Sequence, residues 1–182
     1  MRIAMLGTGS IGGTLGAALT AAGHDVRYGR RTPGSVPAAL DGCDTVVLAV
    51  PGPAVAALLG EHAAALAGRL VIDATNAMTA GGALHARAAV TAAAPGARYA
   101  RAFNVYGFET FRAPAFGADT ASLPFSCAEA DRSVVERLVA DVGLRPVWLG
   151  PDTEEVLDGV TRLWFTLARH HGRHVALKVL AG

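Results

Sequence analysis

Short apolar runs alternate along this chain with longer stretches that are rich in alanine. In the runs at residues 45–50 and 70–74 apolar residues fill consecutive positions, so both faces of these strands are apolar. Such strands are typical of parallel sheets that are buried under helices on both faces. Several runs stop at a glycine or a proline, residues that commonly end strands. The pattern predicts strands at residues 2–6, 25–28, 45–50, 70–74, 99–103, 123–127 and 145–149.

Three segments are predicted to form helices, at residues 11–22, 131–142 and 153–171. Strands that alternate with helices build a doubly wound, mostly parallel sheet with right-handed crossovers. We therefore expect an α/β fold of the Rossmann type. Residues 104–122 follow neither pattern. Because they contain three phenylalanines and a tyrosine, we expect a loop or lid there.

A glycine-rich turn, Gly7-Thr8-Gly9-Ser10-Ile11-Gly12, joins the first predicted strand to the first predicted helix. In this context Gly7 permits a tight turn, Gly9 lets a pyrophosphate approach the backbone, and Gly12 lets helix and strand pack closely. The phosphates are expected to lie on the free amides at the helix start. The alternative is a glycine-rich turn without a ligand. The motif predicts that a nicotinamide dinucleotide binds here.

The end of the second predicted strand decides which dinucleotide is expected. Sites selective for NAD place a carboxylate there to bind the ribose 2′-hydroxyl, whereas this chain has Arg30 and Arg31. Asp25 lies too early in the strand to take that role. The planar guanidinium matches the oxygens of a phosphate, which favours NADP(H). A solvated pair of surface arginines is the alternative.

The composition narrows the partners and the compartment. Sixteen basic residues against fifteen acidic ones give a net charge of +1, which favours neither nucleic acid nor a membrane surface as a partner. No apolar stretch approaches the roughly 20 residues that span a bilayer, and the N-terminal run lacks the features of a signal peptide. Cys43 and Cys127 are expected to be reduced core residues, and the protein to be cytoplasmic. The excess of alanine and arginine is typical of a GC-rich bacterial genome.

Four segments resemble the family of NADPH-dependent coenzyme F420 reductases, which are short Rossmann proteins. They are residues 1–12 with Gly23-His24, the turn Gly29-Arg30-Arg31, the run Val71-Ile72-Asp73-Ala74-Thr75-Asn76, and Arg101-Ala102-Phe103-Asn104. Leu163-Trp164-Phe165 is similar to part of the family's last helix. This chain departs from the family at Arg30, where serine is usual, and at Ala77, where proline is usual. These differences leave the identity of the second substrate open.

The resemblance implies where the nicotinamide lies. It would lie against Ala49, Val50, Pro51 and Asn76, with Ala102 to Asn104 nearby. These residues lie at or just beyond the carboxyl ends of strands, where ligands bind in a doubly wound sheet. Asn76 and Asn104 are candidate catalytic residues that either bond the carboxamide of the nicotinamide or form Asx turns with their own backbone. Tyr106 is the candidate proton donor.

The function expected from these features is hydride transfer between NADPH and a deazaflavin, coenzyme F420, or a flavin as second substrate. This chemistry depends mainly on holding the two rings against each other and less on an acid or base. The carboxylates nearest the expected site are Asp73 and Glu109. The alternatives are an NADPH-dependent reductase of a small carbonyl, imine or enamide substrate, and a dinucleotide-sensing module without catalysis. No metal is expected, because His170 and His174 lack further ligands nearby.

We expect one domain over residues 1–182, with a dinucleotide-binding core at about 1–122 and a C-terminal βαβα extension at about 123–182. The last predicted helix carries an apolar stripe on which we expect a homodimer to form. The stripe consists of Val156, Leu157, Val160, Leu163, Trp164 and Leu167.

Overall fold

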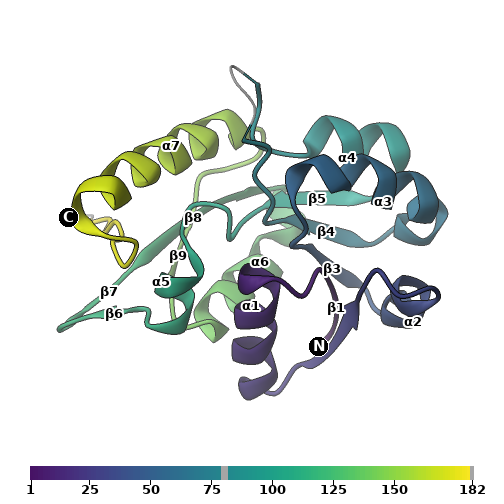
Figure 1. The fold of residues 1–182 in the computed structure, drawn as a ribbon, viewed down its shortest axis with the longest axis horizontal. Helices are drawn as coiled ribbons and strands as arrows, with labels where there is room; N and C mark the ends of the chain where they lie inside the picture. The colour runs from purple at the N-terminus through teal and green to yellow at the C-terminus, as the bar shows by residue number, and fades with distance from the viewer. Residues whose placement is uncertain (79–81, 181–182) are drawn as a thin grey trace.

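A seven-stranded sheet forms the centre of the computed structural model, which describes residues 1–78 and 82–180 (Figure 1). The strand order is β2-β1-β3-β4-β5-β8-β9. The first five strands are parallel, β8 runs antiparallel to β5, and β9 runs parallel to β8. The predicted Rossmann-type, mostly parallel sheet is confirmed. The strands are β1 (Arg2–Leu6), β2 (Asp25–Gly29), β3 (Thr45–Leu48), β4 (Leu70–Asp73), β5 (Arg98–Arg101), β8 (Ser122–Cys127) and β9 (Arg145–Trp148).

Helices cover both faces of this sheet and enclose a separate apolar core on each. One core lies under α1 (Ser10–Ala21), α6 (Glu129–Asp141) and α7 (Glu154–His171). The other lies under α2 (Ser35–Leu40), α3 (Val55–His62) and α4 (Arg87–Ala93). Two short 3-10 turns, η1 (Gly52–Ala54) and η2 (Ala63–Leu66), flank α3. Every residue of β3 and β4 is buried, as expected for strands covered on both faces.

The order of the strands creates a switch point between β1 and β3. From β1 the chain passes through α1 to β2 on one side, and then through α2 to β3 on the other side of β1. Successive connections therefore leave the sheet in opposite directions, and the crevice at the carboxyl ends of β1 and β3 stays open. In doubly wound sheets this crevice is the usual place for a ligand.

The prediction of a lid at residues 104–122 is wrong. The segment contains α5 (Phe108–Arg112) and the small hairpin β6 (Ala115–Phe116) and β7 (Asp119–Thr120). Val105, Tyr106 and Phe111 are buried in the same core as α1 and α6. Tyr106 and Phe111 are therefore core residues, Phe116 packs against the same core, and Phe108 is half-buried outside it. The segment lacks a regular period, so its sequence alone does not reveal that it packs into the core.

The apolar residues of α7 face in two directions. Leu157 and Trp164 are buried against the sheet, and Trp164 donates a hydrogen bond from Nε1 to the carbonyl of Val175 at 2.8 Å. Val156 and Leu163 are exposed at 56% and 48% on the outer side of the helix. The predicted stripe therefore divides into an intramolecular half and an exposed half. In the described part of the chain, no helix has the length and apolar character needed to cross a membrane.

Candidate functional site

A cavity of about 780 Å³ opens at the switch point. Its walls come from the turns after three strands: the glycine turn after β1, the loop after β2, and the turn after β3. Helix α3 closes the remaining side with Ala57, Leu58, Glu61 and His62. The cavity brings together eight residues that the sequence predicted for the dinucleotide site. They are Gly7, Thr8, Gly9, Arg30, Arg31, Ala49, Val50 and Pro51.

The glycine turn is tight on one side and open on the other. Gly7 has φ +117°, and a Cβ there would lie 2.3 Å from the carbonyl oxygen of Ala49. A Cβ on Gly12 would lie 2.3 Å from the carbonyl oxygen of Gly7, so this glycine lets α1 start directly against the turn. A Cβ on Gly9 would meet no atom of the protein within 4 Å. Packing within the chain therefore accounts for Gly7 and Gly12 and leaves free space in front of Gly9.

The start of α1 lies beside this free space and carries no side-chain cap. Gly9 is its N-cap residue, and its first turn has no acidic residue, so the positive end of the helix dipole is not offset by the protein. Ser10 is exposed and lines a neighbouring groove of about 600 Å³ between α1 and α5. Ile11 is half-buried against the core. The helix start can therefore receive an anion.

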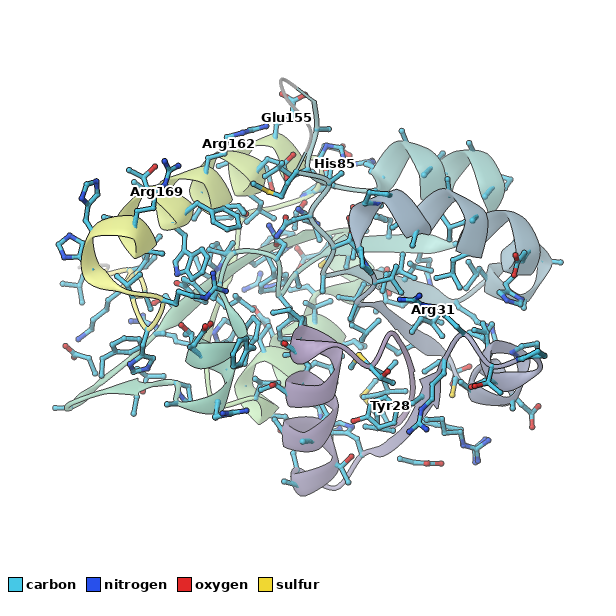
Figure 2. The ribbon with its side chains drawn as sticks, in the orientation of Figure 1. Tyr28, Arg31, His85, Glu155, Arg162 and Arg169 are labelled. Atoms are coloured by element: carbon cyan, nitrogen blue, oxygen red, sulfur yellow. The ribbon has the colours of Figure 1, made fainter. Side chains whose placement is uncertain are left out.

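Arg30 and Arg31 line the cavity from the loop after β2. Figure 2 shows the side chain of Arg31. Both side chains are exposed. Within residues 1–78 and 82–180 neither guanidinium forms an ion pair, although most other arginines of the chain do. Asp25 lies at the far end of β2, where it pairs with Arg2 and Arg27. Two unpaired cations therefore border the cavity, and the only carboxylate of β2 faces elsewhere.

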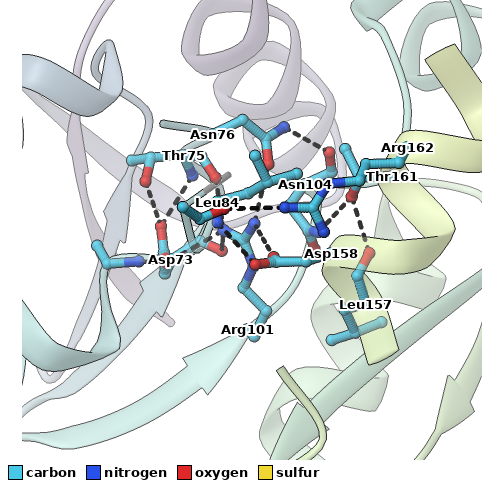
Figure 3. Close-up of polar contacts among 12 residues, drawn as sticks. Asp73, Thr75, Asn76, Leu84, Arg101, Asn104, Leu157, Asp158, Thr161 and Arg162 are labelled. Carbon is cyan, nitrogen blue, oxygen red and sulfur yellow. Dashed lines mark hydrogen bonds and ion pairs between the residues drawn. The ribbon is translucent and has the colours of Figure 1, made fainter. Parts of the chain in front are cut away.

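Asn76 lies three residues beyond β4 and is half-buried. Its Oδ1 accepts a hydrogen bond from Nη2 of Arg101 at 2.8 Å, and its Nδ2 donates to the carbonyl of Asn104 at 2.8 Å (Figure 3). Asn76 therefore joins the ends of β4 and β5 and does not form an Asx turn with its own backbone. It does not line the cavity of 780 Å³.

A buried ionic cluster lies behind Asn76 (Figure 3). The fully buried guanidinium of Arg101, at the end of β5, lies 3.0 Å from Asp73 at the end of β4 and 3.1 Å from Asp158 on α7. Asp73 also accepts hydrogen bonds from the backbone amides of Thr75 and Ala86. Further donors to these two carboxylates are Thr75 Oγ1, the Tyr99 hydroxyl and the amide of Leu84.

The structure corrects the roles expected for Asn104 and Ala102. The side chain of Asn104 is only 2% exposed, and its Nδ2 donates to Oγ1 of Thr161 on α7 at 2.9 Å. Phe103 turns the chain here with φ +62°, which directs Asn104 inward. Ala102 is fully buried at the end of β5. Both residues are buried, and neither lines the cavity.

Tyr106 is also placed differently from the expectation that it donates a proton. Its hydroxyl donates to the carbonyl of Ser122 and accepts from the amide of Leu177 at 3.1 Å, and the residue is only 3% exposed. Burial raises the pKa of this hydroxyl, although the hydrogen bond from Leu177 lowers it. The proton of Tyr106 is thus committed to a structural hydrogen bond away from the cavity. This contradicts its assignment as a proton donor.

The sequence analysis assigned no role in the site to Arg101, Asp158 or Thr161. It also did not predict that α3 forms a wall of the cavity. A charged residue in the last position of a buried strand, as Arg101 is, was a signal that a partner must be buried with it. Asp158 and Thr161 gave no comparable signal, because polar residues within an amphipathic helix normally face the solvent.

Comparison with known proteins supports the fold. No family model matches this sequence, and no curated protein matches it. An Arthrobacter sp. FB24 protein, provisionally described as an F420-dependent NADP-reductase, has a similar structure over its whole length and the whole of this chain. The TM-score is 0.84 and the sequence identity 24%.

Two longer reductases share the same architecture. An imine reductase of Streptomyces aurantiacus matches 92% of this chain with a TM-score of 0.71 and 18% identity. A reductive aminase of Aspergillus terreus, in complex with NADPH and ethyl-5-oxohexanoate, matches 91% with a TM-score of 0.64 and 19% identity. This chain spans 61% and 60% of the lengths of those two proteins. The likeness is therefore one of fold.

Proposed function

We propose that this protein is an NADP(H)-dependent oxidoreductase that transfers hydride between NADPH and a planar flavin-like or deazaflavin acceptor such as coenzyme F420. The observation that carries the proposal is the cavity at the switch point. Its walls combine the open glycine turn with two arginines that have no carboxylate partner in the described residues. The reductive aminase with NADPH bound and the Arthrobacter protein support the same cofactor class.

The residues present fit a dinucleotide with a 2′-phosphate. The free space at Gly9 and the uncapped start of α1 match a pyrophosphate in charge and in the room that it needs. Arg30 and Arg31 supply the cations that a 2′-phosphate requires. Val50 and Pro51 give the far end of the cavity an apolar wall. The dinucleotide, when bound, supplies the hydride, while the protein binds and orients it.

The state of three acids near the ends of β4 and β5 supports this acceptor class. Asp73 and Asp158 are both buried and both pair with Arg101, and the hydroxyl of Tyr106 is used elsewhere. None of the three is available to donate a proton to a substrate. Hydride transfer to a conjugated ring depends on the apposition of two planar groups and does not need such a donor. The full-length likeness to the Arthrobacter protein favours the same acceptor.

A second candidate function is reduction of a small carbonyl, imine or enamide substrate. The structural likeness to the imine reductase and the reductive aminase favours it. Both of those proteins are considerably longer than this chain. A third candidate, a dinucleotide-sensing module, keeps the same cavity without turnover.

One spectroscopic experiment separates the three candidates. Oxidation of NADPH is followed with coenzyme F420, with FMN and with a panel of carbonyl and imine compounds as acceptors. Our proposal predicts fast turnover with a deazaflavin or flavin and little with the panel. Turnover confined to the panel would establish the second function. Tight binding of NADPH without any turnover would establish the third.

A further inference from the structure

Helix α7 bonds directly to Asn104 and reaches Asn76 only through Arg101. Thr161 accepts the hydrogen bond from Nδ2 of Asn104, and its own hydroxyl donates to the carbonyl of Leu157 at 2.9 Å. Asp158, one turn earlier, pairs with Arg101 at 3.1 Å. Arg101 in turn donates to Asn76. The side chains of Asp158 and Thr161 are both buried. Figure 3 shows α7 meeting the segments that follow β4 and β5.

This arrangement determines how the amide of Asn76 is oriented. A guanidinium has only donors and a backbone carbonyl only accepts, so Arg101 must face Oδ1 and Asn104 must face Nδ2. An inverted amide would set two donors against each other and two acceptors against each other. In residues 1–78 and 82–180 the second N–H of Nδ2 has no hydrogen-bond partner. Asn76 is half-buried just outside the lining of the cavity, so this donor can be offered to a ligand that extends beyond that lining.

We propose that α7 positions the side chain that recognises the nicotinamide. Asp158 acts through Arg101 and Thr161 acts through Asn104, and together they fix the orientation of the Asn76 amide. The free N–H of Asn76 then binds the carboxamide oxygen of the nicotinamide. Arg101, Asp158 and Thr161 are positioning residues, and Asn76 is the residue that touches the cofactor. The inference rests on the proposed function, because it needs a dinucleotide in the cavity. It adds which group of the protein recognises the nicotinamide and which element holds that group.

The test compares two ligands that differ only in the nicotinamide. NADP⁺ and 2′-phospho-ADP-ribose share the adenosine, the 2′-phosphate and the pyrophosphate, so their affinity ratio isolates the contribution of the nicotinamide. Calorimetric titration of each ligand is carried out with the wild-type protein, with Thr161→Val and with Asp158→Asn. A residue that merely stabilises the fold lowers the melting temperature and leaves the ratio unchanged.

The chain offers a matched control for each variant. Thr166 also lies on α7 and donates to the carbonyl four residues earlier, but it is exposed and contacts no residue of the cluster, so Thr166→Val controls for Thr161→Val. Asp152 pairs with Arg87 at the surface, so Asp152→Asn controls for Asp158→Asn. Thr161→Ser keeps the hydroxyl and serves as the conservative variant if Thr161→Val folds poorly.

We expect Thr161→Val and Asp158→Asn to lower the ratio of the affinity for NADP⁺ to the affinity for 2′-phospho-ADP-ribose by about 3- to 10-fold. A change of this size corresponds to the loss of one hydrogen bond. The affinity of both variants for 2′-phospho-ADP-ribose should remain that of the wild type, and Thr161→Ser and both controls should keep the ratio. The inference is overturned if the ratio stays constant in both variants, or if the controls reduce it equally. It is also overturned if the wild type binds both ligands equally well. Binding of neither ligand would refute the proposed function itself.

Discussion

Gly9 is the residue at which folding and binding can be separated most cleanly. Its φ of −70° is accessible to alanine, and a Cβ would meet no protein atom. Because alanine is less favourable than glycine at an N-cap, we expect Gly9→Ala to lower the free energy of unfolding by no more than about 1 kcal/mol. The methyl group occupies the space of the pyrophosphate, so the affinity for NADPH should fall at least about tenfold.

Denaturant unfolding and fluorescence titration measure the two effects of Gly9→Ala. Gly13→Ala is the control, because its Cβ would make only an ordinary contact of 3.8 Å with the carbonyl of Thr8 and does not line the larger cavity. Unchanged affinity in Gly9→Ala would mean that no ligand approaches this backbone.

Arg30 and Arg31 should determine the choice between NADP(H) and NAD(H). Charge-assisted hydrogen bonds contribute roughly 1.5–3 kcal/mol each, so the preference for NADP(H) should be at least about tenfold. Replacing both arginines by alanine should remove most of it and leave the affinity for NAD(H) nearly unchanged. Calorimetric titration at constant ionic strength measures the four affinities. Equal affinities in the wild-type protein would rule out this role.

At the scale of elements, Tyr106 links the segment after β5 to the start of β8 and to the C-terminal segment. Tyr106→Phe leaves a buried carbonyl and a buried amide without a partner, which costs about 1–3 kcal/mol of stability. Hydride transfer at saturating substrate should remain close to that of the wild type. Chemical denaturation and single-turnover kinetics provide the measurements. A 10²- to 10⁴-fold loss of turnover with a carbonyl substrate would restore Tyr106 as a proton donor.

The elements show how far sequence reasoning reaches. Apolar runs predicted the strands of the seven-stranded sheet to within two residues at each end, because strands buried on both faces must be continuously apolar. The glycine turn and the two arginines were found because they are contiguous in the sequence. The cluster around Arg101 was not found. Its partners Asp73 and Asp158 lie 28 and 57 residues away, so only the folded topology shows that they meet.

At the scale of the whole molecule, burial of Trp164 changes the surface on which we expect a homodimer to form. Trp164 is only 2% exposed and Val160 packs against the core, so the residues of the stripe that remain available are Val156, Leu163 and the half-buried Leu167. These residues form a stripe about 16 Å long. An antiparallel pair of α7 helices would bring Glu155 of one copy near Arg169 of the other. Figure 2 shows both residues, at opposite ends of the helix.

We expect sedimentation equilibrium at micromolar concentration to show a dimer of the 18.5 kDa chain. Leu163→Glu should dissociate it, because the substitution buries an unpaired charge at the centre of the stripe. Val179→Glu is the control, since this exposed apolar residue lies on the C-terminal segment away from α7. A monomeric wild-type protein would contradict the expectation.

The burial of the central strands has a consequence for hydrogen exchange. The amides of β3 and β4 are bonded to neighbouring strands on both sides and covered by helices on both faces, so no local opening exposes them. Their deuterium uptake should require global unfolding and should report the stability of the whole molecule. The amides of the two-residue strands β6 and β7 lie in a small separate hairpin and should exchange within seconds. Mass spectrometry of peptic peptides would thus resolve a slowly exchanging centre and a rapidly exchanging periphery.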